Sequence, residues 1–363
     1  MQPNRLPSAG QATQMLKCMM LCSWALVGAG ASRMPEGITG FMQQDAKEQQ
    51  PINDRPIIGI LSQPGDPAPK NMSYIAASYV KWVESAGARV VPIFYDMSEE
   101  QVRQRFNVIN GLLIPGGGAN LSPGHKFYDT ANLLVELAIQ ANDKGDYFPV
   151  QGTCLGLETL SIIITRNYTI LGHFNALDAA APLMYTDVAR ESHFLKSLPK
   201  DVCRSLQDQP IAMENHGKGL SLAAVKENKR LDDFFNVISL SVDKSGNPYV
   251  STIEAKEYPI VATQWHPEKN PFEWTASLSI PHSSEAVRMS QEVGNFFIAE
   301  ARLNMHHSHN LAEEDDLLIY NWHAEYTGRR SYDGEEAAFE QAYFFPPASA
   351  ASVSSRNSSK SIE

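Results

Sequence analysis

The stretch Phe148-Pro-Val-Gln-Gly-Thr-Cys-Leu-Gly-Leu-Glu158 places a cysteine between two glycines, directly after a short apolar run. The form G-x-C-x-G is typical of a nucleophile elbow, because a sharp strand-to-helix turn exposes the nucleophile and tolerates only small neighbours. The positive end of the following helix should lower the pKa of the thiol. We therefore predict that Cys154 is a catalytic nucleophile. The alternative is a buried structural cysteine in a glycine-rich turn.

Short apolar runs alternate with helical patterns around this turn. Strands are predicted at 57–61, 89–94, 111–114 and from 148, and later at 236–240, 249–253 and 259–263. Helices are predicted from Ser73, from Ser98, over 131–143 and over 284–304, the last with one face on the sheet. This alternation indicates right-handed βαβ crossovers, hence a doubly wound α/β fold with a mostly parallel sheet and helices on both faces. Active residues in such sheets lie at the carboxyl ends of strands.

A thiol nucleophile needs a base, and the stretch Gln264-Trp-His-Pro-Glu268 supplies one at the end of another apolar run. In extended chain His266 and Glu268 project to the same side, so the carboxylate can orient the imidazole and stabilise its charged form. We predict a triad of Cys154, His266 and Glu268. The alternative for a histidine at such a position is a structural role.

Pro115-Gly-Gly-Gly118 follows the strand that precedes the elbow strand. Glycines at this place let the backbone approach a substrate oxygen, so the N–H groups of Gly117 and Leu155 are predicted to form an oxyanion hole. A plain turn is the alternative explanation of the glycine triplet.

Several motifs together resemble one family. They are GLLIPGGGANL, GDYFPVQGTCLGLETL, ATQWHPEKNPFEW, NFFIAEARLNMHH and LIYNWHAEYTG. The chain is similar, from Pro56 to about Phe345, to class I glutamine amidotransferase-like cysteine hydrolases and, more narrowly, to the gamma-glutamyl hydrolases that act on folate polyglutamates. The resemblance implies a flavodoxin-like fold, no metal or organic cofactor, and a homodimer.

The resemblance also carries over individual positions. It implies that Cys154 is the nucleophile, His266 the base and Glu268 its partner. Glu158, one helical turn after the cysteine, and His216 match substrate-binding positions, although a helix-capping glutamate and a surface-loop histidine are the alternatives. The chain departs from the family at Asn215 and Gln151, where family members have aromatic residues, so chain-length preference is not predicted.

Composition excludes some classes of function. The 363 residues carry a net charge of −11, which argues against a nucleic-acid partner because such a partner requires a basic face. Residues 1–31 read as a secretory signal peptide with cleavage after Ala31, the alternative being a hydrophobic helix of the fold. No stretch is long enough for a permanent membrane anchor. Secretion, or delivery to a lysosome or vacuole, is the expected localisation, and four N-glycosylation sequons fit this route.

The predicted organisation has four parts: a signal peptide at 1–31, a flexible lead-in at 32–55, a hydrolase domain at 56–345 and a disordered Ser-rich tail at 346–363. After removal of the leader only Cys154 and Cys203 remain, and a bridge between them would consume the nucleophile. We predict hydrolysis of gamma-glutamyl bonds in folate poly-gamma-glutamates through a thioester. The alternatives are a glutaminase that releases ammonia and a binding module without activity.

Overall fold

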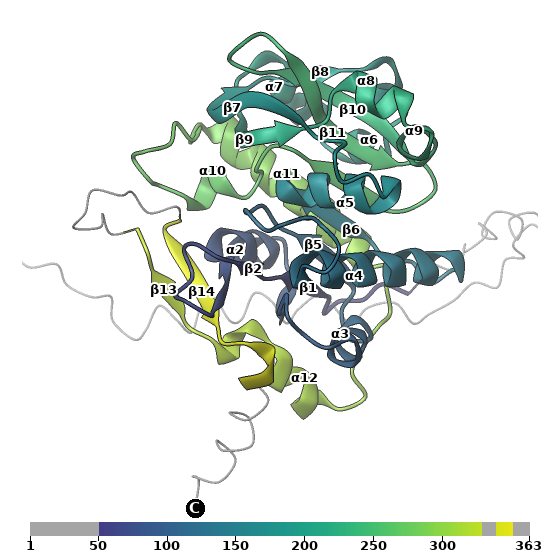
Figure 1. The fold of residues 1–363 in the computed structure, drawn as a ribbon, viewed down its shortest axis with the longest axis vertical. Helices are drawn as coiled ribbons and strands as arrows, with labels where there is room; N and C mark the ends of the chain where they lie inside the picture. Colours follow the sequence, from purple (N-terminus) through teal and green to yellow (C-terminus); the bar gives the residue numbers. More distant parts are fainter. Residues whose placement is uncertain (1–50, 329–338, 351–363) are drawn as a thin grey trace, which may run out of the picture. The chain divides into compact units, whose positions relative to one another are not determined.

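An eight-stranded sheet organises the part of the chain that the structure describes, residues 51–328 and 339–350. In this computed structural model the strand order is β4-β1-β5-β6-β12-β11-β10-β8 (Figure 1). The bounds are β1 Ile57–Leu61, β4 Arg89–Ile93, β5 Gly111–Ile114, β6 Val150–Thr153, β8 Met184–Tyr185, β10 Phe235–Val242, β11 Pro248–Ala255 and β12 Ile260–Thr263. The predicted leader at 1–31, residues 32–50 of the lead-in and the tail from 351 lie outside the described residues.

The first five strands of this order pair in parallel, and the remaining three pair antiparallel. The prediction of a doubly wound, mostly parallel sheet is confirmed. Strands β5, β6 and β12 are neighbours, so the loops that follow them meet at one edge of the sheet. These three loops begin with Pro115, Cys154 and Gln264.

Helices cover both faces of the parallel strands. The bounds are α2 Ala77–Ser85, α3 Glu99–Phe106, α4 Lys126–Asp143, α5 Leu155–Thr165 and α11 Ser284–Ala301. From β1 the chain crosses to β4 in one direction along the sheet, and it later crosses to β5 and β6 in the opposite direction. Right-handed crossovers that run in opposite directions place their helices on opposite faces of the sheet. Accordingly α2 packs with α11, whereas α3 packs with α4 and α4 with α5. The helix predicted from Ser98 is α3, and a capping box between Ser98 and Gln101 starts it.

The contact between α2 and α11 is built around Trp82. Its ring stacks on that of Phe297 with a centroid distance of 6.3 Å, and its Nε1 donates to the Ser290 carbonyl at 2.8 Å. A methyl group at Gly294 would lie 3.1 Å from this Nε1, so a larger residue would require the Trp82 ring to shift by a few tenths of an ångström. The prediction that α11 packs one face on the fold holds for Val293 and Phe297, but Val287 is exposed, and the helix ends three residues before 304.

The antiparallel part of the sheet carries a second layer. Strands β7 and β9 form a separate two-stranded ribbon. Its elements and the short helices near it are β7 Gly172–Ala181, β9 Ala212–Gly219, η1 Asp187–Glu191, α6 His193–Ser197, α7 Lys200–Asp208, α8 Leu222–Glu227, α9 Lys229–Phe234 and α10 Lys269–Phe272. The ribbon brings residue 216 to the same edge of the sheet as the loop after β12, since the His266 backbone N–H donates to the Met213 carbonyl of β9 at 2.8 Å.

The helix predicted from Ser73 is wrong in its first four residues. Ser73–Ala76 form the buried strand β3, and α2 begins at Ala77. Strand β3 pairs with β14, so a distant part of the chain overrides the helical spacing. This small sheet has the order β13-β14-β3-β2, with bounds β2 Gln63–Pro64, β13 Ala324–Tyr326 and β14 Gln341–Phe345.

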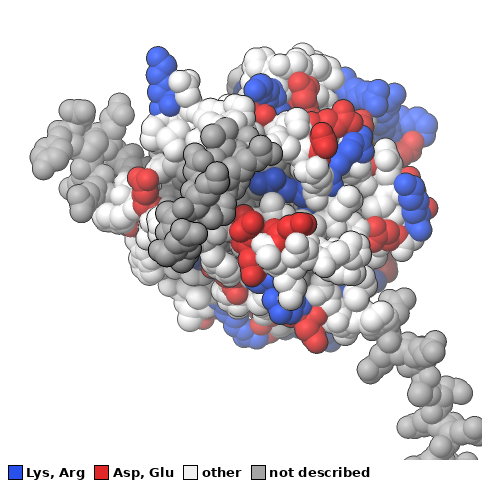
Figure 2. Space-filling view, turned by 90° about the horizontal axis from the view of Figure 1, so that it is seen from below, with Lys and Arg blue, Asp and Glu red and all other residues white. Residues whose placement is uncertain are grey.

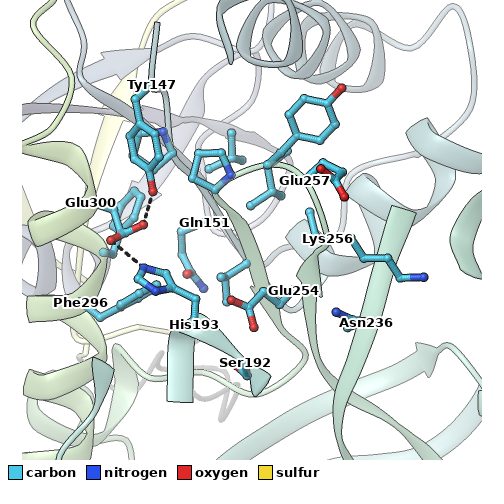
Figure 3. Close-up of a pocket in the computed structure, with 18 of the residues that line it drawn as sticks. Tyr147, Gln151, Ser192, His193, Asn236, Glu254, Lys256, Glu257, Phe296 and Glu300 are labelled. Carbon is cyan, nitrogen blue, oxygen red and sulfur yellow. Dashed lines mark hydrogen bonds and ion pairs between the residues drawn. The ribbon is translucent and has the colours of Figure 1, made fainter. Parts of the chain in front are cut away.

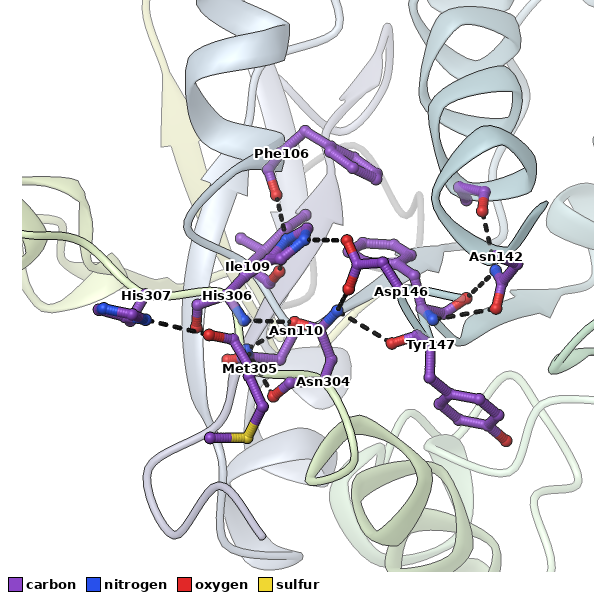
Figure 4. A network of polar contacts seen from close by, with 12 residues as sticks. Phe106, Ile109, Asn110, Asn142, Asp146, Tyr147, Asn304, Met305, His306 and His307 are labelled. Atoms are coloured by element: carbon purple, nitrogen blue, oxygen red, sulfur yellow. Dashed lines mark hydrogen bonds and ion pairs between the residues drawn. The ribbon is translucent and has the colours of Figure 1, made fainter. Parts of the chain in front are cut away.

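A polar network just beyond α11 attaches the chain to the amino-terminal edge of the main sheet (Figure 4). The chain continues from there toward β14. Asn110 donates to the Asn304 side-chain oxygen at 2.9 Å, and Asn304 donates to the Tyr147 carbonyl at 2.9 Å. His306 Nε2 lies 2.7 Å from a carboxylate oxygen of Asp146, and its Nδ1 faces two backbone carbonyls. These bonds fix the exit of α11 and direct the chain toward α12 Leu311–Leu317, η2 Ile319–Asn321 and β13.

The disorder predicted for 346–363 is wrong at its start. Ala348 is buried, and its N–H lies 3.2 Å from the carboxylate oxygens of Asp96. Its burial on the body of the fold orders the beginning of the predicted tail.

Charged side chains of both signs are interspersed on the face that Figure 2 shows, with lysine and arginine close to aspartate and glutamate. Within residues 51–328 and 339–350, no helix combines the length and the apolar character that a membrane span requires.

Candidate active site

Cys154 stands at the strained turn between β6 and α5. Its backbone has φ 53° and ψ −106°, a conformation that non-glycine residues rarely adopt. A methyl group at Gly152 would lie 2.8 Å from Leu160 Cδ1, and one at Gly156 would lie 2.1 Å from the Ile114 carbonyl oxygen. Both glycines are therefore required by the backbone path, as the elbow pattern predicts.

His266 and Cys154 approach each other across Gly116. A methyl group at Gly116 would lie 2.8 Å from His266 Cε1 and 3.3 Å from Cys154 Cβ, so the two side chains flank one small residue. Glu268 Oε1 lies 2.7 Å from His266 Nδ1. The three residues of the predicted triad thus come together, with the second ring nitrogen, Nε2, free of Glu268.

The predicted reason for the contact between His266 and Glu268 is wrong. Strand β12 ends at Thr263, and Glu268 has φ −74° and ψ −19°, which is helical rather than extended backbone. The two side chains meet because the chain turns into α10 immediately after Pro267. A helical turn brings the carboxylate back toward the ring.

The prediction that the thiol pKa is lowered is also wrong. Burial, together with the negative charges of Glu158 and Glu214, raises the pKa of Cys154 well above its ordinary value. The Leu155 N–H at the start of α5 lowers this pKa, but burial and the carboxylates outweigh it. The resting thiol is therefore neutral and requires a base during attack.

Glu268, which faces His266 Nδ1, is ionised. Burial raises the pKa of Glu268. The charge and hydrogen bond of His266, together with the charge of Lys269, lower this pKa by more than burial raises it, so the net shift is downward. A carboxylate on Nδ1 keeps Nε2 available to accept a proton and stabilises the imidazolium that results.

Tyr79, in α2, is a further residue beside His266. Its hydroxyl accepts the Gly116 N–H at 2.8 Å and lies 3.4 Å from His266 Nδ1. Burial, followed by the charge of Glu268, raises the pKa of Tyr79 well above its usual value, so the hydroxyl stays neutral. No motif in the sequence pointed to this role.

Of the two backbone groups predicted for the oxyanion hole, the structure places the Leu155 N–H against the thiol and Gly117 in the cavities that Cys154 lines. A methyl group at Gly117 would lie 2.4 Å from the Gln63 side chain, so a larger residue at position 117 would displace that side chain. The arrangement can accommodate an oxygen next to the nucleophile.

Cys154 lies between two clefts, both of which are also lined by Gly117 and Asn215. The wide cleft, about 890 Å³, extends between the 117–122 loop, the first turns of α5 and the β7–β9 ribbon. The narrow cleft, about 310 Å³, contains His266. Cys154 therefore borders two cavities of different width.

Glu158 and His216 both line the wide cleft, and both are buried. Burial raises the pKa of Glu158, although His216 and Gln264 act in the opposite direction. His216 is not a surface-loop residue: it lies in β9, with Nε2 3.1 Å from Glu214 Oε2 and Nδ1 2.7 Å from the Lys218 carbonyl. These two contacts fix the orientation of the ring.

The two cysteines of the described chain, Cys154 and Cys203, are free, so no bridge consumes the nucleophile. In the same part of the chain, no group of three or more His, Cys, Asp or Glu side chains is placed to hold a metal ion. Asn215 lines both clefts, whereas Gln151 is buried in β6 and lines a different cavity.

That third cavity, about 290 Å³, lies at the opposite end of the sheet, beside the start of β6 and β12 (Figure 3). Glu300 accepts hydrogen bonds from the Tyr147 hydroxyl and from His193 there. Its lining includes Ser192, whose hydroxyl caps α6, but no cysteine. Cys154, His266 and Glu268 do not line this cavity.

Comparisons with known proteins agree with this geometry. The peptidase C26 family model matches residues 56–268, which include the elbow and His266. The chain is 40% identical to the Gamma-glutamyl hydrolase of Rattus norvegicus over 329 residues, covering 90% of this chain and 98% of that protein. It is 40% identical to the Gamma-glutamyl hydrolase of Homo sapiens over 294 residues, covering 80% and 90%. It is also 40% identical to Gamma-glutamyl hydrolase B of Dictyostelium discoideum, covering 81% and 84%.

Among solved structures, a glutamine amido transferase from Methylobacillus Flagellatus aligns with 70% of this chain and 97% of its own, at 11% identity and a TM-score of 0.42. The family assignment depends on the sequence relatives and on the family model. The chain belongs to the peptidase C26 family, with curated gamma-glutamyl hydrolases as its relatives.

Proposed function

We propose that this protein is a cysteine hydrolase that cleaves gamma-glutamyl bonds, with pteroyl poly-gamma-glutamates as its substrates. The observation that carries the proposal is the approach of Cys154 and His266 across Gly116, with Glu268 on the other ring nitrogen. The names of the relatives support the type of bond.

The first half of the reaction forms a thioester. His266 Nε2 takes the proton of the neutral Cys154 thiol while the sulfur attacks the gamma-carbonyl carbon. The carbon–sulfur bond forms, and the negative oxygen accepts hydrogen bonds from the Leu155 and Gly117 N–H groups. When the carbon–nitrogen bond breaks, the imidazolium gives its proton to the leaving amine.

The second half reverses the roles of the same groups. His266 takes a proton from water, whose oxygen attacks the thioester carbon. The carbon–sulfur bond breaks, the gamma-carboxylic acid is released, and the sulfur regains a proton. Glu268 stabilises the imidazolium in both halves, and the scheme uses no metal or organic cofactor.

The two clefts suggest how the substrate is divided. The leaving amine must be close to His266, so the leaving glutamate occupies the narrow cleft. The acyl part, which carries the bulky pteroyl group, occupies the wide cleft of about 890 Å³. Glu158 and His216 line the wide cleft and contact the polar groups of the acyl part.

Incubation of the protein with pteroyl-penta-gamma-glutamate, followed by mass spectrometry of the products, tests the proposal. We expect shorter pteroyl glutamates plus glutamate or glutamyl peptides, and no products with the Cys154→Ala variant at an unchanged melting temperature. Free glutamine is offered in parallel. Release of ammonia from glutamine without cleavage of the pteroyl substrate would contradict the proposal and favour a glutaminase.

We also propose entry into the secretory pathway, toward the exterior, a lysosome or a vacuole. The leader pattern at 1–31 supports this route. Expression in a eukaryotic cell, followed by amino-terminal sequencing of the mature protein, tests it: a first residue at Ser32 is expected. The homodimer implied by the family resemblance stays a prediction, and light scattering of the purified protein checks it.

A further inference from the structure

The cavity of about 290 Å³ beside the start of β6 and β12 is acidic. Its lining includes four glutamates, of which Glu254 and Glu300 are buried. Lys256 also lines the cavity, but its Nζ is directed away from it and donates to the Asp232 carbonyl at 2.5 Å (Figure 3). Among the residues that the structure describes, no lysine or arginine forms an ion pair with either buried glutamate. Negative side chains therefore dominate a cavity that lies apart from the catalytic residues.

Glu254, in β11, has one carboxylate oxygen that is used and one that is not. Oε1 accepts the Phe194 N–H at 3.1 Å, at the start of α6. Oε2 is buried and has no hydrogen-bond partner within the described part of the chain. The side chain is only 8% exposed, and Figure 3 shows its carboxylate directed toward Gln151, among the side chains that line the cavity. A buried carboxylate oxygen without a donor is costly, so this oxygen is placed to accept a hydrogen bond from a ligand.

Glu300, the second buried glutamate, already has its donors. Its carboxylate accepts the Tyr147 hydroxyl, and its other oxygen lies 3.1 Å from His193 Nε2. Burial, followed by the hydrogen bond with Glu300 and the charges of Glu300 and Glu254, raises the pKa of Tyr147 above its usual value. Both carboxylates thus act on one hydroxyl, so they lie close to the same space. Glu300 adds negative charge there, and Glu254 provides the free acceptor.

The rest of the wall favours an organic cation over a metal ion. Phe296 of α11 lines the cavity, and its ring lies 5.7 Å from that of His193. An aromatic ring beside a carboxylate suits an ammonium on a hydrocarbon body, because the ring attracts the charge and packs against the carbon atoms. Within residues 51–328 and 339–350, no cluster of three or more metal-ligating side chains is present. The volume is near the lower limit of about 300 Å³ for ligand pockets, so the ligand must be small.

We propose that this cavity binds a small primary ammonium ion, with the charged nitrogen donating to Glu254 Oε2 and the hydrocarbon part against Phe296. The ammonium has three donors and a positive charge, so it satisfies the free oxygen and offsets the acidic lining. The site is separate from the proposed hydrolytic centre, because neither Cys154 nor His266 lines it. It is a second ligand site of the protein, at the opposite end of the strand that precedes the nucleophile.

The test uses calorimetric titration of the whole protein with n-butylammonium chloride at pH 7, where an alkylamine is protonated. The comparison ligand is n-butanol, which has a similar size and no charge. We expect saturable binding of n-butylammonium that is about 10- to 100-fold tighter than that of n-butanol, because a hydrogen bond to a charged group is strong. Glu254→Gln keeps an oxygen for the Phe194 N–H and should lose most of this preference. Glu158→Gln, which alters a buried carboxylate in the wide cleft, should keep it.

Absence of saturable binding of n-butylammonium to the unmodified protein would overturn the inference, and so would equal affinities for the two ligands. Neither result requires a variant to fold. Unchanged binding to a Glu254→Gln protein of normal melting temperature would also overturn it. Loss of binding in Glu158→Gln instead of Glu254→Gln would place the cation in the wide cleft and would likewise contradict the proposed site.

Discussion

The Tyr79 hydroxyl lies 3.4 Å from His266 Nδ1, on the ring nitrogen that also faces Glu268. The same hydroxyl accepts the Gly116 N–H, so it links the glycine turn to the catalytic base. Helix α2 thus positions a base that belongs to the loop after β12.

Tyr79→Phe removes this hydroxyl and keeps the ring. We expect kcat/KM to fall by about 3- to 10-fold, because one hydrogen bond to the glycine turn and one polar neighbour of the base are lost. Steady-state kinetics on a pteroyl diglutamate measures the effect. Tyr147→Phe is the matched control, since its hydroxyl bonds to Glu300 in the distant cavity and its loss should leave kcat/KM unchanged. An equal effect of the two variants would refute a positioning role for Tyr79.

Glu268→Gln removes the charge that stabilises the imidazolium. We expect kcat to fall by about 10²- to 10⁴-fold, as for a triad whose carboxylate is replaced by its amide. The melting temperature separates this loss from unfolding. Glu300→Gln, which also alters a carboxylate beside a histidine but lies outside the two clefts, should keep its activity. Activity of Glu268→Gln within a few-fold of the unmodified protein would remove Glu268 from the triad.

Gly156→Ala should destabilise the fold severely. The added methyl group would lie 2.1 Å from the backbone oxygen of Ile114, which cannot move without displacing β5. A loss of about 3 kcal/mol or more in the free energy of unfolding follows from overpacking against a rigid strand. Gly172→Ala is the control, because its nearest neighbour is 3.5 Å away. Chemical denaturation of both variants gives the comparison, and similar midpoints would contradict the elbow geometry.

Glu158→Gln should change the pH dependence of stability. The folded pKa of Glu158 is raised above its ordinary value of 4.5, chiefly by burial. Between 4.5 and the raised pKa, the folded protein binds more protons than the unfolded chain, so the free energy of unfolding falls as pH rises through this window. The glutamine variant lacks this loss. Its melting temperature relative to the unmodified protein should therefore increase from pH 4 to pH 7; a constant difference would argue against a raised pKa.

The sequence predicted the parallel strands well, because β1, β5 and β12 are short, fully buried and largely apolar runs. The sequence also predicted the elbow. The strained turn at Cys154 requires small residues at positions 152 and 156, and the glycines there are visible in the sequence. The segment 73–76 was misread because its spacing fits a helix, whereas its partner β14 lies more than 260 residues later in the chain. Local pattern carries no information about such a pairing.

The pKa shifts at the site could not be predicted from the sequence, for a related reason. Glu214 reaches the neighbourhood of Cys154 from β9, and Lys269 meets Phe339 from the carboxyl-terminal segment. Whether these charges face the thiol or the solvent depends on the packing of the ribbon and of β14. The contact between His266 and Glu268, which are two residues apart in the sequence, was predicted correctly, although the backbone between them was predicted to be extended.

The pairing of β14 with β3 can form only late in synthesis, because β14 lies near the end of the chain. Translation produces the nucleophile early, whereas Phe339 and the strand that covers β3 leave the ribosome close to the end. A nascent chain that has passed Glu268 contains Cys154, His266 and Glu268 but not yet the strand that pairs with β3. The small sheet therefore closes only when this last strand docks on β3.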